Sequence, residues 1–175
     1  MAKICIDAGH GGADAGAVNG KMYEKDYALS IAIKVADKLE ALGHTVYMTR
    51  EMDKALTLQQ RCDVANKNKC DAFVSVHLNS ATNKNAEGLE TFMWKKIDKT
   101  LATNIQNSLI ALFPEEKNRG VKSAQYYVLN NTKVSAALVE VGFISHDPTA
   151  EKFHSYYYQN RLAEAIVNGI LKTVV

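Results

Sequence analysis

The 175-residue sequence lacks the features that would assign it at once to several common classes. Its net charge is only +2, and no basic run interleaves with aromatic residues, so nothing predicts a nucleic-acid partner. No apolar run approaches the roughly 18 residues that a membrane span needs, so we expect no membrane partner. The three cysteines, Cys5, Cys62 and Cys70, are odd in number and widely spaced, without a C-x-x-C pair, which predicts buried free thiols.

Signals of export and of several domains are also missing. Met-Ala-Lys leads directly into an apolar segment, so we expect synthesis in the cytoplasm without a signal peptide. We find no repeat, low-complexity segment or linker, and 175 residues suit one domain with a substantial core. Hydrophobic residues (47%) and charged residues (23%) occur at the levels typical of a globular protein.

Several catalytic motifs are absent as well. A dinucleotide fingerprint that starts at Gly9 would need a third glycine where Asp14 stands. A Walker loop that ends at Gly16 would need Lys and Ser or Thr where Ala17 and Val18 stand. There is no H-E-x-x-H helix of a zinc protease and no G-x-S-x-G elbow of a serine hydrolase.

What the sequence does contain is a glycine-rich loop at residues 7–16 with a histidine inside it. The apolar run before it, residues 3–6, reads as a buried strand, and the loop would present His10 at the edge of a sheet, where α/β proteins bind ligands. His10 is therefore a candidate metal ligand. The alternative is a turn with an incidental surface histidine.

The first half of the chain alternates between strand and helix patterns. Strands are predicted at residues 3–6, 44–49 and 72–78, and helices at residues 27–42 and from the capping box that Thr57 opens. This β-α-β-α-β order predicts a parallel sheet with right-handed crossovers.

The second half adds three predicted strands and three predicted helices. The sequence therefore predicts a single-domain α/β fold with a twisted, mostly parallel but mixed sheet of about six strands and helices on both faces. The added elements are a strand at 88–94, antiparallel at the edge; a helix from Asp98 to Pro114; a loop at 118–122; a strand at 126–129; a central strand at 135–144; a short helix with Asp147 as N-cap and Pro148 at N1; and a final helix through 162–170.

Two apolar strands carry an ionisable side chain that their setting does not explain, His77 and Glu140. A buried carboxylate without a partner is penalised by several kcal/mol or takes up a proton. His77 alone could be a satisfied core histidine, and Glu140 alone could pair with Arg50 or Arg61.

Taken together, His10, His77 and Glu140 fall at or near strand ends, which gather at one rim of a parallel sheet. Glu24 precedes the first predicted helix, and the short loop from His10 could bring it back to that rim. Two histidines and a glutamate around an open position form a common catalytic zinc shell, and a further glutamate would serve as general base or acid. Asn79 could contact a ligand or the adjoining loop.

These motifs resemble, over nearly the whole chain, the zinc-dependent N-acetylmuramoyl-L-alanine amidases of the Amidase_3 type. The resemblance implies one zinc ion held by His10, Glu24 and His77, with Glu140 as the catalytic carboxylate. We further predict Asn79 and Arg119 as substrate-binding residues. The motifs that carry the resemblance are residues 7–12 with Asp14 and Gly16, Glu24, residues 75–79, 119–122 and 138–145. Ser135 and His146 depart from the family pattern, which often has proline and asparagine there.

The resemblance also implies a substrate and a setting. The family cleaves the amide between the lactyl group of muramic acid and the L-alanine of the stem peptide in bacterial peptidoglycan. We expect residues 1–175 to form the catalytic domain, with no wall-binding domain in this chain although a full-length enzyme can carry one at its C-terminus. The missing signal peptide fits a phage lysin that reaches the wall once the membrane is permeabilised, or the excised catalytic part of a larger enzyme. The rival interpretations are a non-catalytic peptidoglycan-binding module, a zinc hydrolase of another amide and a structural zinc protein.

Overall fold

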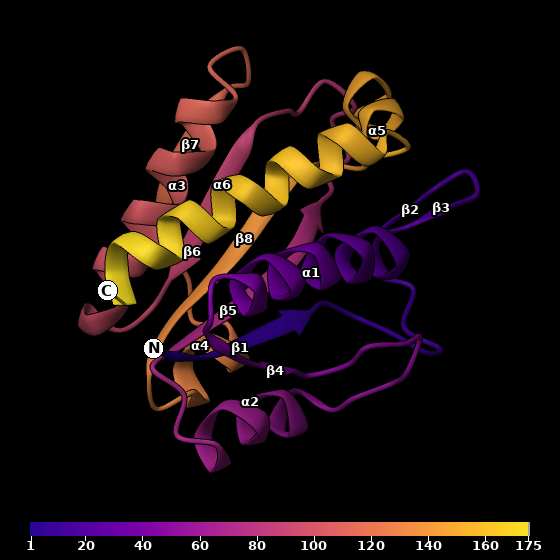
Figure 1. Ribbon diagram of the computed structural model, residues 1–175. Helices are drawn as coiled ribbons and strands as arrows, with labels where there is room; N and C mark the ends of the chain where they lie inside the picture. The colour runs from indigo at the N-terminus through magenta and orange to yellow at the C-terminus, as the bar shows by residue number, and fades with distance from the viewer. Residues whose placement is uncertain (175) are drawn as a thin grey trace.

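The computed structural model describes residues 1–174 and confirms the α/β fold (Figure 1). One six-stranded sheet has the order β4-β1-β5-β8-β6-β7, and β2 and β3 form a separate short hairpin. Strands β4, β1, β5 and β8 are parallel, whereas β6 is antiparallel to β8 and parallel to β7, so the sheet is mixed. The strands are β1 Lys3–Ala8, β2 Val18–Asn19, β3 Met22–Tyr23, β4 Thr45–Met48, β5 Ala72–Asn79, β6 Leu89–Met93, β7 Asn118–Ser123 and β8 Ser135–Phe143.

Helices cover both faces of the sheet, but unequally. The three longest pack together over one face, with α6 against both α1 and α3 (Figure 1). Within residues 1–174, the helices on the opposite face are α2 and α4, which contact each other. The helices are α1 Glu24–Ala41, α2 Leu58–Lys67, α3 Lys99–Leu112, α4 Tyr127–Asn131, α5 Asp147–Lys152 and α6 Tyr156–Val174, with a 3-10 turn, η1, at Lys96–Asp98.

Successive side chains of a strand point to opposite faces of the sheet, so β1 and β5 each contribute to two separate hydrophobic cores. Ile4 and Ile6 of β1 and Val74 of β5 belong to the larger core beneath α1, α3 and α6. Their neighbours Cys5 and Phe73 point the other way, into the smaller core beneath α2 and α4. The thinner cover on this second face leaves the carboxyl ends of β1, β5 and β8 accessible.

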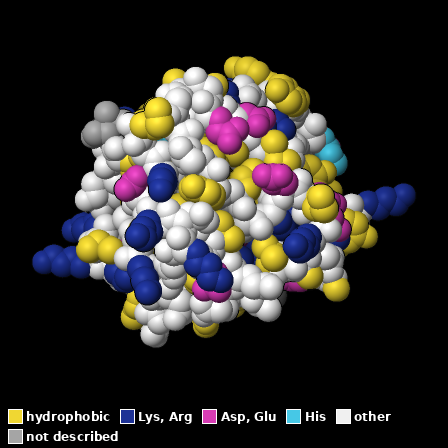
Figure 2. Space-filling model, turned by 60° about the horizontal axis from the view of Figure 1, so that its bottom comes forward, with side chains coloured by type: hydrophobic (Ala, Val, Ile, Leu, Met, Phe, Trp, Pro, Cys, Tyr) yellow, Lys and Arg dark blue, Asp and Glu magenta, His cyan; other side chains and the backbone are white. Residues whose placement is uncertain are grey.

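The three cysteines, all within the described residues, are buried free thiols, as predicted. Figure 2 shows acidic, basic and hydrophobic side chains interspersed on the face that it displays. Within residues 1–174, no helix combines the length and the apolar character that crossing a membrane would require.

Two predicted elements in the second half were wrong. The segment predicted as a strand at residues 126–129 forms α4, and the sixth strand of the sheet is β7, which the sequence indicated as loop and turn. A run of four apolar residues does not separate a strand from a helical turn. Strand β7 is polar, and Gly120 at its centre has φ +78°, beside a shift in the register of β6 and β7. Strand β6 is therefore internal and not at the edge.

Helix starts were predicted with mixed success. Thr57 accepts the backbone N–H of Gln60, which completes the predicted capping box. Asp98 occupies the predicted N-cap position of α3, but its side chain makes no capping hydrogen bond. Its carboxylate instead accepts the backbone N–H groups of Lys95 and Ala136 and so ties η1 to β8. The N-cap of α5 is His146, one residue before the expected Asp147.

Candidate metal centre and catalytic carboxylate

The loop after β1 holds His10 in an unusual backbone conformation. His10 has φ +60°, a left-handed value that costs free energy in residues other than glycine. Several hydrogen bonds maintain it: the N–H of Gly9 donates to the carbonyl of Val76, and the guanidinium groups of Arg50 and Arg61 donate to the carbonyls of Gly9 and His10 at 2.8 and 2.6 Å. The strain is therefore localised at the residue predicted to be a metal ligand.

Asp7, near the end of β1, stabilises this loop through hydrogen bonds of its buried carboxylate. Its carboxylate, 1% exposed, accepts Arg61 Nη1 at 2.8 Å and the hydroxyls of Thr49 and Ser75, both at 2.6 Å. Burial opposes its ionisation, but the charge of Arg61 and these hydrogen bonds outweigh burial and lower the pKa of Asp7. Asp7 thus supports His10 through Arg61.

Glu24, the first residue of α1, is the centre of a three-residue cluster. Its Oε1 lies 3.0 Å from His10 Nε2 and 2.9 Å from His77 Nδ1. Its orientation is fixed because the backbone N–H groups of Ala17 and Leu78 donate to Oε2 and Oε1. One ligand atom from each of the three side chains lies within 4.8 Å of the others.

The electrostatics of the cluster suit a cation. Burial disfavours the charged form of Glu24, yet its hydrogen bonds with His10 and His77 prevail and lower its pKa. Burial likewise opposes a charge on His10, but Glu24 and Asp14 raise the pKa of His10 to about 9. Asp14 lies 2.8 Å from His10 Nδ1, which leaves Nε2 toward the cluster, as in carboxylate–histidine–metal arrangements.

Two glycines give the cluster its room. A Cβ on Gly9 would lie 2.6 Å from His77 Nε2, and a Cβ on Gly16 would lie 2.6 Å from Glu24 Oε2. These positions accept no side chain without displacing a member of the cluster, which explains the glycines at positions 9 and 16.

Glu140 of β8 lies beside the cluster because it is the Cα partner of His77 on β5. Its Oε2 is buried and has no hydrogen-bond partner among the described residues. The alternative of an ion pair with Arg50 or Arg61 is wrong, because Arg61 pairs with Asp7 and Arg50 donates to backbone carbonyls.

The surroundings of Glu140 favour its protonated form. Burial is the largest cause and, opposed by His77 and assisted by the carboxylates of Glu24 and Glu90, raises the pKa of Glu140 to about 7. A carboxyl group with a pKa near neutrality can both accept and donate a proton at physiological pH.

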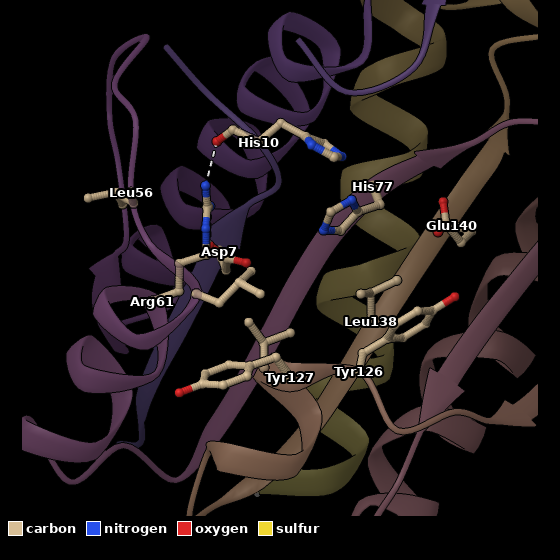
Figure 3. Close-up of a pocket in the computed structure, with 11 residues that line it drawn as sticks. Asp7, His10, Leu56, Arg61, His77, Tyr126, Tyr127, Leu138 and Glu140 are labelled. Atoms are coloured by element: carbon tan, nitrogen blue, oxygen red, sulfur yellow. Dashed lines mark hydrogen bonds and ion pairs between the residues drawn. The ribbon is translucent and has the colours of Figure 1, made fainter. Parts of the chain in front are cut away.

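A cavity of about 240 Å³ opens against these side chains on the thinly covered face (Figure 3). Its polar side includes His10, His77 and Glu140. Its apolar side is formed by Leu56, Leu58, Tyr126, Tyr127, Val128 and Leu138. The cavity is therefore polar where the ionisable cluster lies and apolar toward α2 and α4.

The two predicted substrate-binding residues lie outside this cavity, on a carboxylate that sequence reasoning missed. Asn79 and Arg119 both donate to Glu90, as does Lys122. Glu90 is the Cα partner of Glu140 on β6. The alternating pattern of β6 suggested that one of its faces is solvated, so the sequence offered no clear signal that Glu90 is buried. A role of Asn79 and Arg119 in substrate binding stays a prediction.

Two imidazoles and a carboxylate around one point, with an unpartnered carboxyl group beside a cavity, are typical of hydrolases that activate water with a metal ion. The comparisons with known proteins agree with this class. Residues 4–172 match the family model Amidase_3, N-acetylmuramoyl-L-alanine amidase, and the chain belongs to that family. It is thus an amidase that hydrolyses cell-wall peptidoglycan.

Relatives and solved structures support this assignment along almost the whole chain. The germination-specific N-acetylmuramoyl-L-alanine amidase of Bacillus subtilis (strain 168) is 33% identical over 185 residues, covering 97% of this chain and 78% of the relative. The catalytic domain of the amidase CwlV from Bacillus (Paenibacillus) polymyxa var. colistinus has a TM-score of 0.95 and 34% identity, covering 98% of this chain and 97% of that chain. The amidase AmiC2 of Nostoc punctiforme has a TM-score of 0.94 and 38% identity, covering 98% and 96%.

Proposed function

We propose that His10, Glu24 and His77 hold one zinc ion and that Glu140 is the catalytic carboxylate for cleavage of the amide between muramic acid and L-alanine. The observation that carries this proposal is the convergence of three ligand atoms within 4.8 Å beside a buried, unpartnered Glu140 oxygen. The donor set of two nitrogens and one carboxylate oxygen suits zinc in a site with an open fourth position. Only three such groups lie in the cluster among residues 1–174, which supports a catalytic site over a closed structural one.

A bound zinc ion would supply Lewis acidity, which polarises a carbonyl and lowers the pKa of water. The rest of the chemistry belongs to the protein's own residues. Glu140 accepts a proton from the attacking water and later donates a proton to the alanine nitrogen, so that the C–N bond breaks and the peptide leaves as an amine. The apolar side of the cavity limits the water that surrounds these groups.

Exchange of Glu140 for glutamine tests its proposed role. Glu140→Gln keeps the shape of the side chain but removes the proton carrier, so we expect an unchanged zinc content and a rate lowered by at least about 100-fold. New N-terminal alanine released from purified cell walls measures the rate, and elemental analysis measures the metal.

The products also separate this proposal from its rivals. Released acetate or a released terminal amino acid would indicate hydrolysis of a different amide, and binding to walls without any product would indicate a non-catalytic module. A Glu140→Gln variant that releases alanine at the normal rate would remove Glu140 from the mechanism.

A further inference from the structure

Glu90 holds two cations although it carries a single negative charge. The side chain of Glu90 is almost completely buried, and its Oε1 accepts Asn79 Nδ2. Its Oε2 accepts Arg119 Nε at 3.0 Å and also Lys122 Nζ. One cation is enough to neutralise this carboxylate, so the group formed by Glu90, Arg119 and Lys122 has a surplus positive charge.

The cations lie next to the reacting groups in the sheet. His77 is the Cα partner of Glu140, and Glu140 is the Cα partner of Glu90, so these three side chains form a row on one face. The next partner in the row, on β7, is Gly120, which has open space where its Cβ would be. The row therefore continues from the catalytic carboxyl group to Gly120, which directly follows Arg119 and precedes Lys122 by two residues.

Both cations are accessible from solvent, and Lys122 lies near an aromatic residue of the cavity wall. The side chains of Arg119 and Lys122 are 26% and 39% exposed. Lys122 Nζ lies 5.9 Å from the ring centroid of Phe92, and the ring of Phe92 contacts that of Tyr126, which lines the cavity. A ligand that extends from Glu140 past Tyr126 comes close to Lys122, which shares Glu90 Oε2 with Arg119.

We infer that Arg119 and Lys122, positioned by Glu90, form a subsite for the carboxylate of the stem-peptide residue that follows the alanine. This inference rests on the proposed function. In peptidoglycan that residue is a glutamate joined through its γ-carboxyl group, so its α-carboxyl group is free or amidated. Consecutive Cα atoms of a peptide are 3.8 Å apart, and neighbouring strands of a sheet are about 4.8 Å apart. When the scissile bond lies at Glu140, the residue that follows the alanine therefore falls about one strand further along the sheet.

Two synthetic substrates that differ in one group test the subsite. N-acetylmuramoyl-L-alanyl-γ-D-glutamyl-L-lysine carries the free carboxylate, and its isoglutamine counterpart carries a carboxamide. We expect the zinc-loaded enzyme to have a kcat/KM about tenfold higher for the carboxylate, because a hydrogen bond between charged groups is stronger than one to an amide. Lys122→Gln should lose this preference, mainly because kcat/KM for the carboxylate substrate falls. Lys122→Arg should keep the preference.

Lys117→Gln is the matched control, since Lys117 is an exposed lysine just before β7 that forms no ion pair with Glu90. It should leave the ratio of the two kcat/KM values unchanged. The subsite would be overturned, while the amidase activity stands, by either of two results. One is a wild-type ratio of the two kcat/KM values near one, and the other is a Lys122→Gln variant in which both kcat/KM values fall equally. If neither substrate yields N-terminal alanine, the proposed function fails, and calorimetric binding of the two peptides still decides the subsite: equal affinities overturn it.

Discussion

At the scale of single residues, the site depends on positions where a side chain would not fit. Gly16 and Gly20 provide a matched pair, because their φ angles are +66° and +59°. A Cβ at Gly16 would collide with Glu24 and His10, whereas a Cβ at Gly20 would meet no atom within 4 Å. The two positions therefore separate backbone strain from displacement of the proposed ligands.

We predict that Gly16→Ala and Gly20→Ala each lose about 1–2 kcal/mol of stability from the left-handed backbone. Only Gly16→Ala should also bind zinc more weakly, by at least about tenfold, because the new methyl group displaces Glu24. Urea unfolding measures the first effect, and titration with a competing chelator measures the second. Equal zinc affinities in the two variants would show that the room around Glu24 is not needed.

Three of the four site residues predicted from the sequence conflict with their surroundings, and Glu24 is the exception. His77 and Glu140 interrupt apolar strands, and His10 interrupts a run of glycines, so each indicated chemistry. Glu90 and Lys122 lie in strands with ordinary polar patterns. Their association depends on which strands pair, and the sequence contains no local signal for that.

At the scale of elements, α3 and α6 approach each other closely at Gly169. A Cβ at Gly169 of α6 would lie 2.7 Å from the backbone nitrogen of Ile105 in α3. Helix propensity alone favours alanine over glycine by about 1 kcal/mol. The collision with backbone atoms opposes this gain, since neither helix can yield without moving away from the sheet.

We predict that the collision prevails and that Gly169→Ala destabilises the protein by about 1–3 kcal/mol. The free energy of unfolding in urea gives the sign of the effect directly. A stabilised variant would mean that α3 and α6 separate easily and that helix propensity decides at this position.

Elements with a clear period were predicted well, and short ones were not. The long helices and β1, β5 and β8 follow from their apolar spacing. The stretch that became α4 is too short to show a period, and β7 is a polar edge strand whose place is given by pairing with β6. Both errors concern elements near the proposed carboxylate subsite, where the local pattern is weakest.

At the scale of the whole molecule, the unequal cover of the sheet determines where chemistry takes place. The three longest helices bury one face, and the opposite face, beneath the short α2 and α4, retains the cavity. Parallel strand order brings residues 10, 77 and 140 to one rim, and α1 contributes Glu24 at its start. This convergence was predictable from topology, whereas the distances were not.

The central claim is that these residues bind a metal ion without which the amide is not cleaved. The most direct measurement is the release of N-terminal alanine from purified walls by protein whose metal content is known from elemental analysis. We predict that chelator-treated protein releases none and that one equivalent of zinc restores the rate. Full activity in a preparation shown to contain no metal would contradict the account.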